Sequence, residues 1–147
     1  IISVISSKSQ EHTILRDSIL PGLLENLSKN IHETYPQKFF ESGIVFSKDS
    51  PIKETASLAC VTASEETHFS KIKAVLQSLL RIGFNIKCET KTLSKHALFS
   101  QGRVAEIVIN RKTVGYIGEL DSKVLENFRI RTRVVGFEIK LSGLIFD

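Results

Sequence analysis

The chain reads TILRDSILPGLLENLSKN over residues 13–30 and YPQKFFESGIVF over residues 35–46, and these two stretches decide its fold. In the first, apolar residues recur every three or four positions, which predicts an amphipathic helix. Pro21 falls in the expected first turn, where backbone N–H groups lack helical partners, and Asp17 or Ser18 is expected to cap the helix. The second stretch is rich in Phe, Ile and Val, which predicts a strand.

The remaining sequence alternates between the same two patterns. Apolar residues at helical spacing predict a helix from Phe69 to Leu80, with Gly83 as its left-handed C-terminal residue, and Asp121 is expected to cap a short third helix. Six strands are predicted, at residues 38–46, 56–63, 86–91, 103–109, 113–120 and 134–141. Because several consecutive strands are joined by short turns, we expect an α+β fold in which helices flank a largely antiparallel sheet.

The composition is that of one soluble globular domain over residues 1–147. Apolar residues make up 41% and charged residues 24% of the chain, and no apolar run approaches the roughly 20 residues that span a bilayer. The N-terminus lacks the pattern of a secretory signal, so we expect a cytoplasmic protein without membrane association. The chain begins with Ile and contains no Met, so we expect it to be part of a longer protein.

No motif for metal binding or acid–base catalysis stands out. The four histidines are scattered, so no metal site is predicted. Glu41, Glu106, Glu119 and Glu138 fall within predicted strands, where they could cluster in a cleft for acid–base chemistry. Isolated strand carboxylates usually face water, so a solvated or salt-bridged role is favoured.

Three arginines form a basic pattern near the C-terminal end. Arg129, Arg131 and Arg133 occupy every second position, so an extended backbone would present all three on one side. Together with the net charge of +4, the pattern suggests a contact with RNA phosphates. A solvated edge that discourages strand pairing, or a contact with another protein chain, explains it equally well.

Several short segments, taken in order, resemble one known family. They are residues 13–25, 40–46, 118–120, 124–125 and 137–139. Their order and separation are similar to those of the core synthetase-like domain of phenylalanine-tRNA synthetase beta subunits, closer to the archaeal and eukaryotic type, from about Glu11 to Leu144. The resemblance implies the fold of class II synthetase catalytic domains, an antiparallel sheet flanked by helices.

The resemblance also implies a role. Family members form complexes of two alpha and two beta chains, in which the alpha subunit binds ATP, magnesium and phenylalanine, so no cofactor is expected in this domain. We expect a non-catalytic domain that acts as a structural and assembly partner of the catalytic alpha subunit in tRNA aminoacylation. The alternative is a tRNA-binding module of the same complex that uses Arg129, Arg131 and Arg133.

The cations that adenylate formation needs are absent from their expected place. In catalytic class II members an Arg-x-Glu motif follows the strand that corresponds to the one ending here at Phe46, whereas this chain has Ser47-Lys48-Asp49. Arg103 and Glu106 do not replace that motif, because two residues separate them and their side chains would face opposite sides of a strand. No catalytic residue is therefore predicted.

The apolar stripe of the first helix has two interpretations. Its central residues are Leu20, Leu23, Leu24 and Leu27. An amphipathic stripe packs on a core or meets a partner, and the pattern alone does not separate the two. The resemblance implies that the corresponding helix of related synthetases helps to form the subunit interface, so both interpretations stay open.

Overall fold

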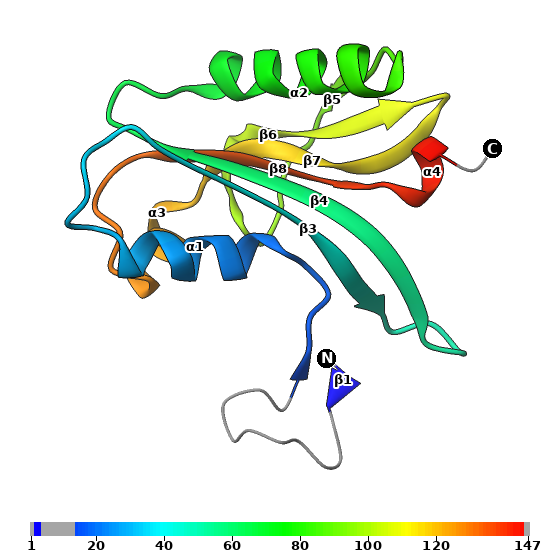
Figure 1. Cartoon of the computed structure of the whole chain (residues 1–147), viewed down its shortest axis with the longest axis horizontal. Coiled ribbons are helices and arrows are strands. Elements are labelled where there is room, and N and C mark those ends of the chain that lie inside the picture. Colours follow the sequence, from blue (N-terminus) through cyan, green and yellow to red (C-terminus); the bar gives the residue numbers. More distant parts are fainter. Residues whose placement is uncertain (1, 4–13, 146–147) are drawn as a thin grey trace.

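The computed structural model describes residues 2–3 and 14–145. Its centre is a six-stranded antiparallel sheet with the strand order β3-β4-β8-β7-β6-β5, and helices cover both faces (Figure 1). The sheet strands are β3 (Gln37–Ser47), β4 (Lys53–Ala63), β5 (Glu89–Thr92), β6 (Phe99–Ile109), β7 (Lys112–Leu120) and β8 (Val134–Lys140). The helices are α1 (Leu20–Lys29), α2 (Phe69–Phe84), α3 (Ser122–Asn127) and α4 (Ser142–Ile145), and two short strands, β1 (Ile2–Ser3) and β2 (Ile14–Leu15), pair with each other.

The predicted α+β plan is confirmed, with all six predicted strands in one antiparallel sheet. The hairpin of β3 and β4 is longer than predicted, because cross-strand pairing continues as far as Ser47 and Lys53. Among the helices of the described residues, none is long and apolar enough to span a bilayer.

The first of two cores lies between the sheet and the helices α1 and α3. The apolar stripe of α1 is 0–2% exposed and consists of Leu20, Leu23, Leu24 and Leu27. It packs on the side chains of β4 that point to the same face, including Ala59 and Val61. Burying a leucine contributes about 1.5–3 kcal/mol. The structure places these four side chains in the core of the chain itself, so a partner would reach α1 only through exposed residues such as Glu25 and Asn26.

The second core lies on the opposite face of the sheet, under α2 (Figure 1). The helix continues past Gly83 and ends at Asn85, which has the left-handed φ of 53°. The prediction that Gly83 supplies this residue is therefore wrong. The extra turn lets Phe84 and Ile86 both pack on this core, and asparagine tolerates the left-handed conformation at low cost.

Candidate functional site

One row of side chains crosses all six strands on the face that carries α1. Direct cross-strand pairing places in this row, from β3 to β5, Glu41, Ala59, Glu138, Tyr116, Glu106 and Lys91. Directly paired residues point to the same face of a sheet, so three carboxylates share the row. Neighbouring strands are about 4.8 Å apart, which places Glu138 about 10 Å from each of the other two. Glu138 is therefore separated from each of the other two carboxylates by an intervening strand.

A cavity of 460 Å³ opens beside the middle of this row. It lies between the start of α1, the segment from His96 to Phe99, and the strands β7 and β8. Apolar side chains form most of its wall, and a few polar side chains, among them Ser57, Tyr116 and Glu138, also line it. This combination is the usual form of a small-molecule site, and it makes the cavity the candidate functional site.

Glu138 holds the start of α1 on the sheet. Its Oε1 accepts a hydrogen bond from the backbone N–H of Ile19 at 2.6 Å, and its Oε2 accepts one from the hydroxyl of Ser18 at 2.6 Å. The hydroxyl of Ser57, which is 2% exposed, lies 3.3 Å from Oε1 and also donates to the carbonyl of Ile139. A carboxylate is favoured at the positive end of a helix.

The prediction that Asp17 or Ser18 caps α1 is wrong. The N-cap residue is Ile19, and the helix receives no hydrogen bond from a capping side chain of its own segment. Neither Asp17 nor Ser18 caps it, because Ser18 donates its hydroxyl to Glu138 instead. The carboxylate that replaces the local cap comes from β8, 119 residues further along the chain.

His96 forms one side of the cavity and was not singled out by its position in the sequence. Its ring centre lies 5.0 Å from that of Phe99 and 4.6 Å from that of Tyr116. Its Nδ1 accepts a hydrogen bond from the backbone N–H of Leu98 at 3.2 Å. Burial lowers the pKa of His96 from its ordinary value of 6.5, against the opposing effect of the charge on Glu138. At neutral pH the ring is uncharged, and its proton is on Nε2 because Nδ1 is an acceptor.

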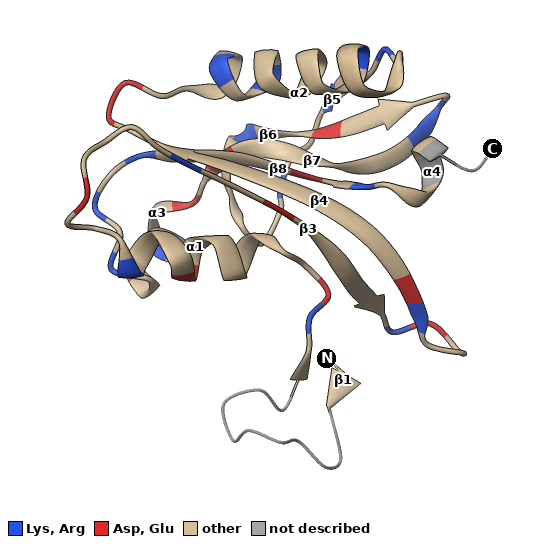
Figure 2. Cartoon of the chain, in the orientation of Figure 1, with Lys and Arg blue, Asp and Glu red and all other residues tan. Residues whose placement is uncertain are grey.

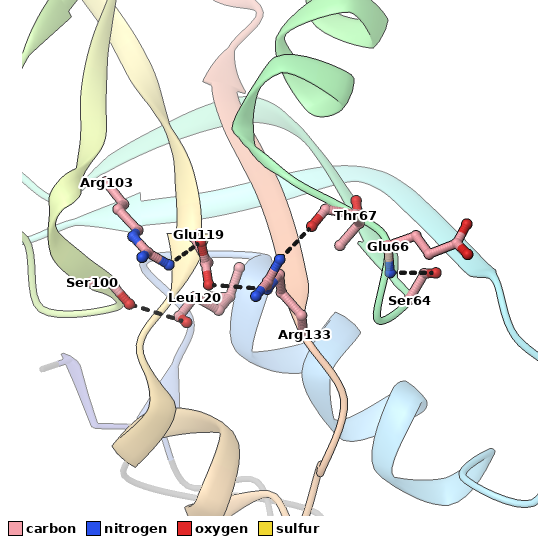
Figure 3. A network of polar contacts seen from close by, with 8 residues as sticks. All are labelled: Ser64, Glu66, Thr67, Ser100, Arg103, Glu119, Leu120 and Arg133. Atoms are coloured by element: carbon pink, nitrogen blue, oxygen red, sulfur yellow. Dashed lines mark hydrogen bonds and ion pairs between the residues drawn. The ribbon is translucent and has the colours of Figure 1, made fainter.

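The remaining strand carboxylates do not join this site. Glu41 forms an ion pair with Arg16 at 2.6 Å. Glu119 points to the opposite face of the sheet and lies 2.9 Å from Arg103 and 3.4 Å from Arg133 (Figure 3). The salt-bridged interpretation is confirmed for these two carboxylates, and the four predicted positions do not meet in one cleft.

Arg133 ties the start of β8 to the segment that enters α2 (Figure 3). Besides its ion pair with Glu119, its guanidinium donates to the carbonyl of Thr67 at 3.3 Å, and its own carbonyl accepts from the N–H of Ser64. Arg133 is thus held by contacts within the chain, and its side chain remains 44% exposed.

Arg129 lies in the turn after α3, and Arg131 lies in the irregular segment between that turn and β8. Arg129 has a φ of 57° and follows the last turn of α3. Its N–H donates to the backbone carbonyl of Glu126, and the N–H of Ile130 donates to the backbone carbonyl of Leu125. These two bonds form a Schellman motif, which requires a left-handed residue at this position. The prediction of an extended backbone is wrong here, although all three arginines are exposed and alternate with buried Ile130 and Thr132.

Arg129 and Arg131 line a hollow of 930 Å³ on the surface. Its other members include Tyr35, which is 43% exposed, and the acidic residues Glu65 and Glu126. Among the described residues, lysines and arginines are spread over helices, strands and loops and do not gather on one element (Figure 2).

The free edge of β3 is the most exposed apolar part of the sheet. Phe40 is 78% and Ile44 43% exposed, on the face of β3 opposite to α1. At one end the edge is covered by Arg16. Its backbone carbonyl accepts from the N–H of Phe46, and its side-chain Nε donates to the carbonyl of Ile44. Alternate residues point their backbone groups to the same edge. Within the described residues, no backbone partner satisfies the outward groups of Phe40 and Ser42. Sequence analysis missed this surface, although consecutive Phe39 and Phe40 signal a strand that is apolar on both faces.

The comparisons with known proteins agree on one family. A family model described as "Phenylalanyl tRNA synthetase beta chain CLM domain" matches residues 1–141. The chain is 38% identical over 149 residues to a phenylalanine–tRNA ligase beta subunit from Pyrococcus abyssi, and 38% identical over 144 residues to one from Methanocaldococcus jannaschii. These matches cover 98% and 95% of this chain but 26% of each relative. The chain thus spans about a quarter of the length of the curated relatives it matches.

The fold is similar to that of solved class II synthetases. A pyrrolysyl-tRNA synthetase from Desulfitobacterium hafniense superposes with a TM-score of 0.79 at 16% identity, over 98% of this chain and 52% of that one. A second structure from the same organism gives a TM-score of 0.74 at 17% identity, over 88% of this chain and 48% of that one. At this level of identity the similarity concerns the fold alone, and the predicted similarity to the class II fold is confirmed.

Proposed function

The chain belongs to the phenylalanyl-tRNA synthetase beta chain family, and from this premise we propose that it is a non-catalytic synthetase-like domain that helps to assemble a tRNA ligase around its catalytic alpha subunit. In the proposed complex of two alpha and two beta chains, the alpha subunit binds ATP, magnesium and phenylalanine. The complex is expected to work in the cytoplasm.

The charge of the sheet row carries the non-catalytic part of this proposal. A transferring phosphate needs cations around it, whereas the row on the α1 face carries three carboxylates, those of Glu41, Glu138 and Glu106, against the single lysine of its last strand. The nearby Arg16 is engaged by Glu41. At the end of β3, where a catalytic relative would have its arginine, Ser47 donates a hydrogen bond to the carboxylate of Asp49. A triphosphate placed here would meet negative charge.

The free edge of β3 supports the assembly part. Phe40 and Ile44 expose apolar surface next to unpaired backbone groups, a combination that favours the addition of a strand or the docking of another chain. Proteins usually blunt such edges with charges, and here the two exposed apolar residues stand on either side of uncharged Ser42.

Co-purification with the cognate alpha subunit tests this function. A beta chain with residues 1–147 and a beta chain without them are each expressed with the alpha subunit, and adenylate formation is measured on whatever assembles. We expect the deletion to abolish both assembly and activity, and Glu41→Gln and Glu106→Gln to leave activity intact. Adenylate formation by this chain without any alpha subunit would contradict the proposal.

A second candidate function is a contact with tRNA, favoured by the hollow that contains Tyr35, Arg129 and Arg131. The salt bridges of the described residues do not include either arginine, so both guanidinium groups can reach phosphates while Tyr35 offers a ring for stacking. Arg133, which is 44% exposed and already engaged by Glu119 and Thr67, is expected to contribute less to this contact than the other two arginines.

Salt-dependent RNA binding tests this second function. If it holds, Arg129→Ala and Arg131→Ala each weaken tRNA binding by the assembled ligase and reduce the slope of log affinity against log salt by about one. Lys123→Ala on the neighbouring helix is the matched control, because it removes an exposed charge outside the hollow. Equal effects of all three changes would indicate non-specific attraction only.

A further inference from the structure

We propose that the cavity beside Glu138 is a binding site for a small hydrophobic amine, a molecule with an apolar body and one ammonium group. This site is separate from the β3 edge and from the arginine hollow, and it does not depend on the proposed assembly role. Its volume of 460 Å³ lies within the range of small-molecule sites.

The wall of the cavity is mostly apolar and would contact the apolar body of the ligand. It contains aliphatic and aromatic side chains from α1, β3, β6 and β7, namely Leu20, Pro21, Val45, Phe99 and Val114. Leu20 and Phe99 are buried in the first core and are therefore fixed in position. A preformed apolar wall of this kind needs no rearrangement to accept a ring or a branched chain.

Glu138 supplies the acceptor for the ammonium group. Its Oε1 already receives the N–H of Ile19, whereas the Ser57 hydroxyl, 3.3 Å from Oε1, donates its one proton over the shorter distance to the carbonyl of Ile139. Among the described residues, Oε2 receives the hydroxyl of Ser18 alone. A carboxylate oxygen accepts two hydrogen bonds, so Oε2 has one acceptor position left. Because the N–H of Ile19 and the hydroxyl of Ser18 fix the carboxylate, a ligand would find it already oriented.

The charges around the cavity favour a cation over an anion. Asp17 and Glu138 contribute two negative charges, and Lys140 contributes one positive charge. His96 is uncharged at neutral pH and presents its Nε2–H, which suits a neutral acceptor on the ligand and not a second ammonium. An added carboxylate would lie among groups that are negative in sum, so an amino acid is expected to bind more weakly than the corresponding amine.

Titration of the isotopically labelled 147-residue chain with 2-phenylethylamine, followed by NMR, tests the proposal. We expect saturable shifts of Tyr116, His96 and Leu98, with the amine binding at least about tenfold more tightly than 2-phenylethanol, its neutral isostere. L-Phenylalanine should bind more weakly than the amine. Equal affinity of amine and alcohol, tighter binding of phenylalanine, or shifts confined to other parts of the chain would each overturn the proposal.

Two variants separate binding from folding. Glu138→Gln is expected to remove the preference for the amine over the alcohol while some binding of both remains. Ala97→Phe, at an exposed position on the cavity wall, should block both ligands without disturbing either core. If Ala97→Phe leaves the affinity for the amine unchanged, the amine binds elsewhere and the proposal is wrong.

Discussion

The carboxylate of Glu138 and the ring of Phe40 lie on the same sheet, two strands apart, in very different surroundings. Glu138 accepts hydrogen bonds from Ser18 and from the backbone N–H of Ile19, and it fixes α1 on the sheet. Phe40 is 78% exposed on an edge strand and contributes little to either core. The α1 face thus uses its polar and apolar groups internally, whereas the free edge of β3 leaves apolar surface for another molecule.

This difference separates stability from assembly. Changes on the α1 face should unfold or loosen the chain whether or not a partner is present, and changes at the β3 edge should leave the isolated chain folded. Under the proposed assembly role, association with the alpha subunit depends on the exposed edge, whereas Glu138 and the leucines of α1 hold the domain together.

The largest effect is expected from Leu23→Asp on the buried side of α1. Leu23 is 1% exposed, so an ionised carboxylate there would be buried without a partner, at a cost of about 3–5 kcal/mol in the free energy of unfolding. Urea unfolding followed by circular dichroism measures this. Asn26→Asp, on the exposed side of the same helix, is the control and should change stability by less than about 0.5 kcal/mol.

The same variant also tests the alternative interpretation of the α1 stripe as a subunit interface. If the Leu23→Asp chain keeps the stability of the unchanged chain and loses only its association with the alpha subunit, the stripe of α1 is an interface, and the core assignment of these leucines fails.

A smaller loss is expected from Glu138→Gln. The change removes charge-assisted hydrogen bonds to Ser18 and Ile19 and a favourable charge at the start of α1, which costs about 1–2 kcal/mol. Glu106→Gln is a matched control in the same sheet row, and no hydrogen bond or ion pair involves the Glu106 side chain in the described residues. Equal losses for the two variants would show that Glu138 has no special part in fixing α1.

The smallest effect is the pH dependence that His96 brings. Burial lowers the pKa of His96 below 6.5, so the unfolded chain binds this proton more readily than the folded chain. The stability contributed by the neutral ring is complete above the unfolded pKa and declines as the pH falls towards the folded pKa. Between about pH 7.5 and about pH 5, the urea midpoint of His96→Gln should therefore fall less than that of the unchanged chain. A larger fall in the variant would contradict the direction of this pKa shift.

The regular elements could be predicted from the sequence because their signals are local. The leucine stripe of α1 and the alternation in β3 each depend on residues a few positions apart. The capping of α1 could not be predicted, since the acceptor Glu138 lies 119 residues away from Ile19. The end of α2 at Asn85 was missed because Gly83 and Asn85 can both adopt the left-handed conformation that ends a helix. Packing of Phe84 and Ile86 on the core selects Asn85.

The candidate site depended even more on tertiary structure. The row from Glu41 to Lys91 follows from the register of five strand pairs, which no local pattern specifies. His96 enters the cavity from the segment between β5 and β6, where its sequence neighbours give no sign of a site. The segment at Arg129 was predicted as extended because arginines at every second position suit a strand, and this spacing gives no sign of the Schellman motif that the structure forms there.

The most direct test of the assembly role compares Phe40→Asp with Ile82→Asp. Both residues are nearly fully exposed, at 78% and 79%, but Ile82 lies on α2 and not on the β3 edge. The measurement is the fraction of alpha subunit that co-purifies with each variant, with the unfolding midpoint of the isolated chain as a check on folding. The account predicts that Phe40→Asp loses the alpha subunit while Ile82→Asp retains it, with both chains folded. Retention of the alpha subunit by Phe40→Asp, or equal loss with both variants, would contradict a role for the β3 edge in assembly.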